Sequence, residues 1–114
     1  MYHILLCCAS GMSSSLLVEK MKRAALERNM EVEIWAVNEA AIKEEAKNAD
    51  VILLGPQVRY KKEELTKGIE KPVDLINMRD YGMMDGEHVL DHALDLIHKN
   101  VSSNFENVPK KSNY

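Results

Sequence analysis

The sequence contains few aromatic residues and few cysteines. Phenylalanine, tryptophan and tyrosine make up 5% of its 114 residues, and Cys7 and Cys8 are the only cysteines. So low an aromatic content argues against an all-β sandwich and against a surface on which nucleic-acid bases stack. Adjacent cysteines do not form an ordinary structural disulfide, and no CxxC motif is present. Both thiols are therefore expected to be reduced, as in a cytosol.

Strong net charge and long apolar runs are absent as well. The formal net charge is −3, so nucleic-acid binding is not expected. No apolar run approaches the ~20 residues of a membrane-spanning helix. The opening "MYHILLCC" lacks the basic region and the small-residue cleavage site of a signal peptide. A chain of this size is expected to form a single domain over residues 1–100, followed by a flexible polar tail over residues 101–114.

Strand-like and helix-like segments alternate along the chain. The first and third strand-like segments are nearly continuous apolar runs, typical of parallel strands buried on both faces. The expected strands are 2–8, 30–37, 49–55 and 71–77, and the expected amphipathic helices are 12–29, 38–48, 58–69 and 85–100. Asn38 is expected to cap the second helix and Gly68 to end the third. The alternation predicts an α/β fold, in which helices cover both faces of a parallel sheet through right-handed crossovers.

The two cysteines lie at the edge of this sheet where ligands are expected. In open parallel sheets, ligands bind beyond the carboxyl ends of the strands. Cys7 and Cys8 end the first strand, and the loops "GPQVRY" and "MRDYGMMDG" follow the third and fourth strands at the same edge. Because side chains alternate along a strand, Cys7 is expected to be a buried core residue and Cys8 to begin the loop.

The segment that follows Cys8 has the composition of an anion-binding loop. Small residues let successive backbone N–H groups converge, and the start of a helix adds unpaired N–H donors and a positive partial charge. The same field lowers the pKa of a thiol, so a thiolate above these donors is suited to accept a phosphoryl group. The candidate phosphate-binding residues are Ala9, Ser10, Gly11, Met12, Ser13, Ser14 and Ser15. An inert buried thiol at Cys8 is the alternative interpretation of "LLCC".

The loop differs from two well-known phosphate-binding motifs. It lacks G-x-x-x-x-G-K-[ST], which disfavours nucleotide hydrolysis. It resembles the loop of low-molecular-weight tyrosine phosphatases, Cys-five residues-Arg, but Ser14 stands where that arginine would be. Arginine stabilises a transferring phosphoryl group, so its absence favours carrying phosphate over hydrolysing it. A cysteine phosphatase or arsenate-reductase-like enzyme remains an alternative, as does a flavodoxin-like receiver or cofactor-binding domain, although "ILLGPQ" lacks a receiver's aspartate.

Three segments resemble one known family. "CASGMSSSLL", "ADVILLGPQVRY" and "YGMMDGEHVL" are similar to motifs of the enzyme IIB component of the bacterial sugar phosphotransferase system, in its lactose/cellobiose/chitobiose branch. The resemblance runs from about residue 3 to about residue 99, and it places the family's nucleophile on Cys8. The sequence departs from the family pattern in the order of Ala9 and Ser10 and in having Ser14 in place of threonine. Both departures keep the side chains of the loop small.

The resemblance implies a fold and a role. The implied fold has three layers, α/β/α, around a four-stranded parallel sheet of order 2-1-3-4, as in low-molecular-weight tyrosine phosphatases. The implied role is that of a cytoplasmic phosphocarrier without a cofactor. A phosphohistidine of enzyme IIA donates its phosphoryl group to Cys8, which passes it to a disaccharide of the cellobiose, chitobiose or lactose type held by the membrane transporter, enzyme IIC. Transfer to two partners in turn requires an open surface around Cys8.

Loop position suggests where partners dock and whether a metal binds. The candidates for an exposed docking rim are Met12, Pro56, Gln57, Tyr60, Tyr81 and Met83. His88 and His92 share one face of the last helix, a spacing that can bind zinc. Because the sequence offers no evident third ligand, no metal site is expected.

Overall fold

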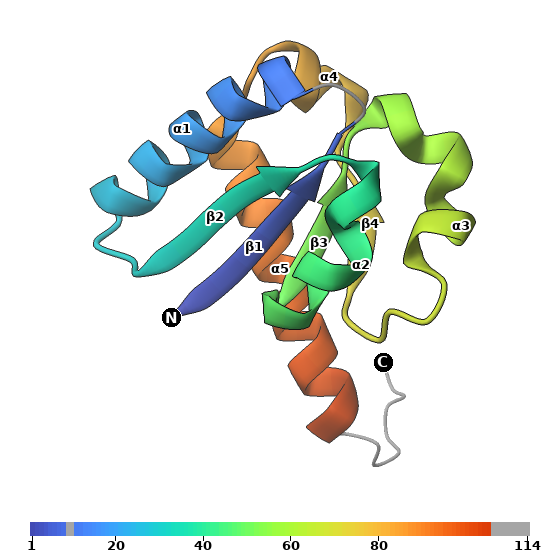
Figure 1. Ribbon diagram of the computed structural model, residues 1–114. Helices are drawn as coiled ribbons and strands as arrows, with labels where there is room; N and C mark the ends of the chain where they lie inside the picture. Colours follow the sequence, from blue (N-terminus) through green and yellow to red (C-terminus); the bar gives the residue numbers. More distant parts are fainter. Residues whose placement is uncertain (9–10, 106–114) are drawn as a thin grey trace.

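The centre of the protein is a parallel sheet. The computed structural model describes residues 1–8 and 11–105, with the side chains of residues 1–8 and 15–99. Figure 1 shows four strands in the order β2-β1-β3-β4, all pairing in parallel, which confirms the predicted topology. The strands are β1 (Tyr2–Cys7), β2 (Val32–Val37), β3 (Val51–Leu54) and β4 (Val73–Leu75).

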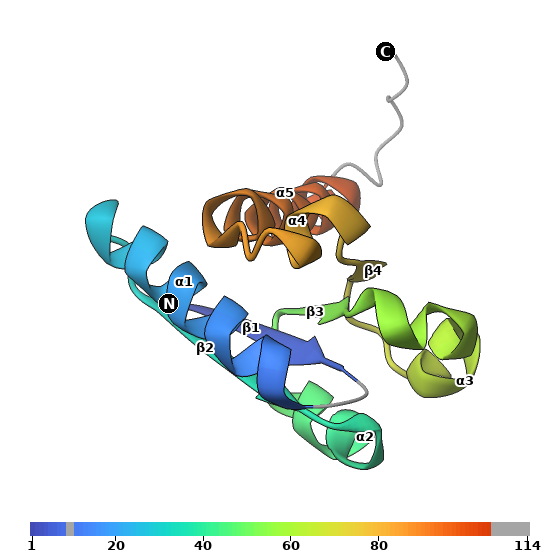
Figure 2. The same ribbon diagram turned by 90° about the horizontal axis from the view of Figure 1, so that it is seen from above.

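Helices cover both faces of this sheet. The helices are α1 (Gly11–Glu27), α2 (Ile42–Glu45), α3 (Lys62–Thr66), α4 (Met78–Gly82) and α5 (Gly86–Phe105). The 3-10 segments Glu39–Ala41, Ala46–Asn48 and Pro56–Lys61 flank α2 and α3. Seen from above in Figure 2, α1 and α5 lie on one side of the sheet and α2 and α3 on the other. The three-layer α/β/α architecture is therefore confirmed.

Each face of the sheet has its own hydrophobic core. Along β1, Ile4 and Leu6 point into the core shared with α1 and α5, and Leu5 points into the core shared with α2 and α3. This is the alternation expected of a strand. Both central strands are covered on both sides, and every residue of β3 is buried. Their nearly continuous apolar sequences follow from that position.

The predicted helix cap at Asn38 and the predicted helix end near Gly68 are both confirmed. The Asn38 side chain accepts hydrogen bonds from the backbone N–H groups of Ala40 and Ala41, so it caps the segment that leads into α2. Gly68 follows α3 with φ of 84°, a left-handed conformation that favours glycine. The second predicted helix, however, is broken into short 3-10 and α segments.

Two predicted loop regions are partly helical. Residues 78–82 form α4, because the Asn77 side chain accepts hydrogen bonds from the N–H groups of Arg79 and Asp80 and so caps a helix start. Helix α5 continues to Phe105, since no glycine or proline interrupts residues 87–105. The predicted tail boundary at residue 100 therefore falls inside a helix, and residues 106–114 lie outside the described residues. In the part of the chain that the structure describes, no helix is long and apolar enough to cross a membrane.

Candidate phosphoryl-transfer site

Cys8 lies where the central strand gives way to a helix. It follows β1 directly, its backbone N–H donates to the carbonyl of Val37 at 3.3 Å, and α1 begins at Gly11. A thiol is thus placed close in sequence to a helix N-terminus, whose unpaired N–H groups favour an anion. Of the predicted phosphate loop, Ala9 and Ser10 lie outside the described residues, as do the side chains of residues 11–14; Ser15 is exposed.

The two neighbouring thiols are in different surroundings. Cys7 points into the core between the sheet and α2 and α3, and Cys8 points into the opposite core with α1 and α5. No disulfide joins them. Burial raises the pKa of the Cys7 thiol to about 12, and the nearby Cys8 and Glu39 add to this rise. Cys7 is therefore a protonated core residue at neutral pH, as predicted.

Cys8 itself is less accessible than the sequence suggests. Only 1% of its surface is exposed, whereas the expected role requires an open thiol. The reason is the alternation of β1, which continues one residue beyond the strand and turns the Cys8 side chain toward the same core as Ile4 and Leu6. The site in this state is a buried thiol at the carboxyl edge of the sheet.

Gly55 forms a wall beside the Cys8 sulfur. A Cβ atom at Gly55 would lie 2.9 Å from Cys8 Sγ and 2.7 Å from Gln57 Oε1. The backbone at Gly55 has φ of −65° and ψ of 155°, which any residue can adopt, so the space alone requires glycine here. Its N–H donates to the carbonyl of Cys7 at 2.8 Å and joins the ends of the two central strands. The sequence indicated only that Gly55 ends a strand.

The predicted docking residues divide into exposed and buried ones. Tyr60 and Met83 are exposed by 77% and 65%, Gln57 is exposed and Pro56 is half-buried. Tyr81 is only 8% exposed and packs in the same core as Cys8, so its prediction as an exposed rim residue is wrong. Helix α4, which was not predicted, turns its ring inward. The side chain of Met12 lies outside the described residues.

A hollow borders the loops at this edge of the sheet. It has a volume of about 310 Å³ and lies between the segment after β3 and helix α4. Its lining residues are Pro56, Gln57, Arg59, Met78, Tyr81 and Gly82. Gln57 therefore lines this hollow, and its Oε1 lies close to the same point beside Gly55 as the Cys8 sulfur.

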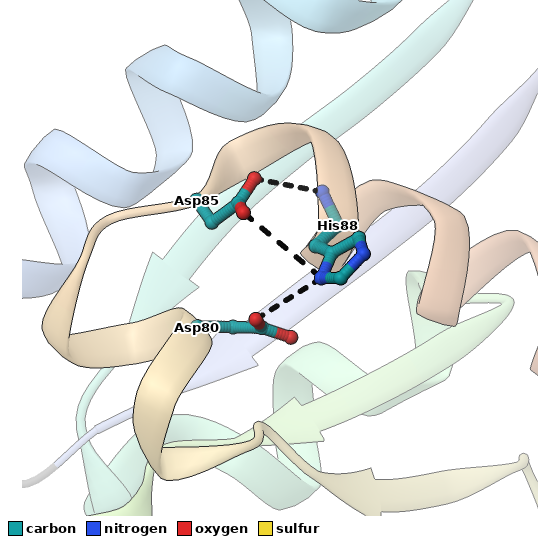
Figure 3. A group of neighbouring side chains, drawn as sticks. All are labelled: Asp80, Asp85 and His88. Atoms are coloured by element: carbon teal, nitrogen blue, oxygen red, sulfur yellow. Dashed lines mark hydrogen bonds and ion pairs between the residues drawn. The ribbon is translucent and has the colours of Figure 1, made fainter.

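Two of the three histidines of α5, His88 and His92, have separate acidic partners. Figure 3 shows His88 between Asp80 and Asp85: its Nδ1 lies 3.1 Å from Asp80 Oδ1 and 3.9 Å from Asp85 Oδ2. The hydrogen bond with Asp80 and the charges of both aspartates raise the pKa of His88. The backbone N–H of His88 also donates to Asp85 Oδ1 at 3.1 Å. His92 Nε2 instead lies 3.1 Å from Asp74 Oδ2.

This grouping was not foreseen from the sequence, which pairs His88 with His92. Ligand atoms of His88, Asp80 and Asp85 lie within 4.8 Å of one another, a spacing that a metal ion could bridge. A protonated imidazole satisfies the same two carboxylates without an ion. The arrangement therefore works as an ion-pair clamp between α4 and the start of α5.

The fold and the thiol define a class of protein: a small α/β domain with a cysteine at the carboxyl edge of its central strand, suited to phosphoryl transfer. Residues 3–92 match the family model described as "PTS system, Lactose/Cellobiose specific IIB subunit". The chain therefore belongs to the lactose/cellobiose IIB family of the phosphotransferase system, and it is a phosphotransferase of sugar transport. This confirms the family expected from the three sequence segments.

Similar proteins agree with this family. The chain is 46% identical to the oligo-beta-mannoside-specific EIIB component of Bacillus subtilis (strain 168), over 85% of this chain and 97% of that protein. It is 46% identical to the galactose-specific EIIB component of Lactococcus lactis subsp. cremoris (strain MG1363), over 82% and 94%. The solution structure of the cellobiose-specific IIB component from Borrelia burgdorferi superposes with a TM-score of 0.74, at 40% identity over 86% and 93% of the two chains.

Proposed function

We propose that Cys8 carries the phosphoryl group. The single observation that supports this assignment is the contrast between the two thiols: Cys7 has a pKa of about 12 in one core, and Cys8 lies at the strand end next to the start of α1. A nucleophilic thiol must reach its thiolate form, which the surroundings of Cys7 oppose. Cys8 is thus the sulfur suited to the chemistry of the family.

The proposed reaction has two displacement steps at phosphorus. In the first, the Cys8 thiolate attacks the phosphohistidine of enzyme IIA; the S–P bond forms, the N–P bond breaks, and the imidazole leaves. In the second, a hydroxyl of the sugar attacks the phosphocysteine; the O–P bond forms, the S–P bond breaks, and the hydroxyl proton passes to solvent or a base. Both steps depend on positioning and charge stabilisation rather than on a metal or cofactor.

Ser14 favours a carrier over a phosphatase. It stands six positions beyond Cys8, where the loop of a low-molecular-weight tyrosine phosphatase has arginine. Without that guanidinium, attack by water on the phosphocysteine is weakly assisted, so the S–P bond survives until a sugar arrives. The competing function, a cysteine phosphatase or arsenate reductase, requires the isolated chain to turn over an aryl phosphate or arsenate.

The acceptor that we propose is a disaccharide of the cellobiose, chitobiose or lactose type. Relatives named for oligo-beta-mannosides, galactose and cellobiose are 46%, 46% and 45% identical to this chain. Nearly equal similarity to proteins of three sugar systems supports the proposal that the choice of sugar lies mainly with the transporter, enzyme IIC. The carrier then needs to fit its partners rather than one particular sugar.

Both partners must reach Cys8 from the same edge of the sheet, on the cytoplasmic side of the membrane. Exposed large apolar side chains at that edge provide a docking surface, which we define as Leu16, Tyr60, Met78 and Met83. Such side chains are favourable to bury against a protein partner. Since Cys8 is 1% exposed, docking must also uncover its sulfur.

The test is phosphorylation of the whole chain by phosphorylated enzyme IIA, with the modified residue located by mass spectrometry. Cys8→Ala is expected to abolish uptake of the phosphoryl group, and Cys7→Ala, the matched change one residue away, is expected to retain it. Transfer onward is followed in membranes that contain the matching enzyme IIC and a panel of disaccharides. Phosphorylation of Cys8→Ala to the level of the wild type would refute the assignment, and turnover of an aryl phosphate by the isolated chain would favour the phosphatase.

A further inference from the structure

We propose that the side-chain amide of Gln57 donates a hydrogen bond to the phosphoryl group on Cys8, in a space that exists because residue 55 is glycine. This inference rests on the proposed phosphocysteine and assigns Gln57 a role at the sulfur in place of one in partner docking.

The amide and the sulfur occupy the same small space. Cys8 Sγ and Gln57 Oε1 lie 2.9 Å and 2.7 Å from the point where a Cβ of Gly55 would be. Gln57 is an exposed residue, yet the end of its side chain lies beside the same point of Gly55 as the sulfur of Cys8, a residue that is 1% exposed. The side chain therefore extends from the surface toward the Cys8 sulfur.

The position of this wall is fixed by the backbone. Gly55 donates its N–H to the carbonyl of Cys7 at 2.8 Å, and the turn that carries Gln57 begins there, with the N–H of Val58 donating to the carbonyl of Gly55 at 3.1 Å. Val58 is fully buried. Gln57 thus stands between two anchored residues, and only its side chain has to move when the sulfur gains a phosphoryl group.

An amide suits a phosphate carrier in this position. Its oxygen and nitrogen exchange places by a half-turn of the terminal bond, so the side chain that places Oε1 near a thiol can present N–H to an anionic phosphoryl oxygen. Hydrogen bonds to a charged acceptor are stronger than neutral ones. A neutral donor adds no positive charge. It therefore stabilises the phosphocysteine without the charge stabilisation by which the arginine of a phosphatase loop assists attack by water.

The lack of a side chain at Gly55 leads to a separate prediction. A methyl group at residue 55 would have to displace either Gln57 or Cys8, and the end of a long, exposed side chain moves at lower cost than a buried thiol. Gly55→Ala is therefore expected to push the amide out of the site and to reproduce the effect of removing it.

The experiment measures the equilibrium distribution of the phosphoryl group between enzyme IIA and the whole chain, by intact mass after mixing. Docking residues change how fast this equilibrium is reached but not its position, so the readout separates a contact to phosphate from a docking role. Gln57→Leu and Gly55→Ala are expected to shift the equilibrium toward the donor by about 10- to 100-fold, the range of a hydrogen bond to a charged group. Gln57→Glu, which brings a negative charge to the phosphate, should shift it further.

Gly82→Ala is the matched control for Gly55→Ala. Among the residues that the structure describes, no atom lies within 4 Å of a Cβ at Gly82, which lines the same hollow, so this variant should keep the wild-type equilibrium. If Gly55→Ala does not fold, the equilibrium measured for Gln57→Leu, a change at an exposed position, still tests the inference. A wild-type equilibrium in Gln57→Leu would overturn the inference while leaving phosphocysteine intact.

A second measurement does not depend on the proposed function. The pH dependence of alkylation by iodoacetamide reports on the Cys8 thiol, because the pKa of Cys7 is about 12. A carboxylate at residue 57, beside the sulfur, should raise the pKa of Cys8 and move the profile of Gln57→Glu to higher pH. An unchanged profile would show that the side chain does not reach the sulfur, and the inference would then be wrong even if phosphorylation never occurs.

Discussion

Gly86 and Lys20 bring two helices into direct backbone contact. A Cβ atom at Gly86 would lie 2.5 Å from the carbonyl carbon of Lys20 and 2.6 Å from the backbone nitrogen of Met21. Helix α5 therefore begins against the middle of α1, at a distance that only glycine permits. The same two helices cover the face of the sheet toward which Cys8 points.

Gly86→Ala is expected to destabilise the protein. The methyl group would meet backbone atoms, which cannot move aside as a side chain can, so the two helices must separate. A loss of about 1–3 kcal/mol in the free energy of unfolding is expected, as for other overpacked sites. The measurement is the midpoint of urea unfolding. The control is Gly82→Ala in α4: its added methyl would have no atom of the described residues within 4 Å, so this variant should not lower the midpoint.

Cys7 is expected to resist alkylation in the folded protein. Burial raises its pKa to about 12, so almost none of it is thiolate at pH 8. Native Cys8→Ala should therefore take up no iodoacetamide at pH 8 over a time in which the urea-unfolded chain is fully modified. Intact mass gives the count of modified thiols. Rapid modification of native Cys8→Ala would contradict the assignment of Cys7 to the core.

The ion pairs of His88 predict a pH-dependent contribution to stability. Asp80 and Asp85 raise the pKa of His88 above its ordinary value of 6.5, so the protonated form is favoured by folding. The contribution is fully present below pH 6.5 and is lost as the pH rises through the higher pKa of the folded state. The difference in urea midpoint between wild type and His88→Gln should thus be larger at pH 5.5 than at pH 8.5.

Asp80→Asn tests the same pair from its other side. This variant removes the negative charge of Asp80, and with it the charge-assisted hydrogen bond that does most to raise the pKa of His88, while it keeps the imidazole. Its stability profile should lose most of the pH-dependent part that His88→Gln loses. His92→Gln, which disrupts the separate pair with Asp74, should leave that part in place. A profile for His88→Gln parallel to that of the wild type would contradict the clamp.

Gly68 is expected to tolerate asparagine better than alanine. Its φ of 84° lies in the left-handed region, and no atom of the described part of the chain lies within 4 Å of an added Cβ, so the cost of substitution is conformational. Gly68→Ala should lower the free energy of unfolding by about 1–2 kcal/mol, and Gly68→Asn by less, because asparagine enters this region more readily. Equal urea midpoints for both variants and the wild type would count against this account.

The pattern of apolar residues predicts most of the fold, because helices cover both faces of the sheet and bury its central strands. Strands β1 and β3 are buried on both faces, and their sequences are apolar runs. The turns after β2 and α3 could also be predicted, because the side chain of Asn38 and the backbone freedom of Gly68 act locally. Helix α4 was missed because Asn77, its cap, stands before a segment rich in glycine and methionine with no apolar period. Once that helix is known, the burial of Tyr81 follows.

The walls of the site could not be predicted in the same way. The contact of Gly55 with Cys8 depends on the register between β1 and β3, in which Cys7 lies opposite Leu54, and no local pattern encodes it. The grouping of His88 with Asp80 likewise depends on how α4 packs against α5. Sequence spacing predicts which thiol is the nucleophile but not which groups lie around it.

The hydrogen bond between Gly55 and Cys7 has a consequence for how such a chain can diverge. It ties together the two buried strand ends that border the Cys8 sulfur, so the atom that we propose to react is positioned by the least variable kind of environment in a protein. Tyr60 and Met83, in contrast, project from the surface and have few constraints of packing. On the docking surface that we propose, new partners can therefore be acquired by exchanging such side chains, while the buried surroundings of Cys8 stay unchanged.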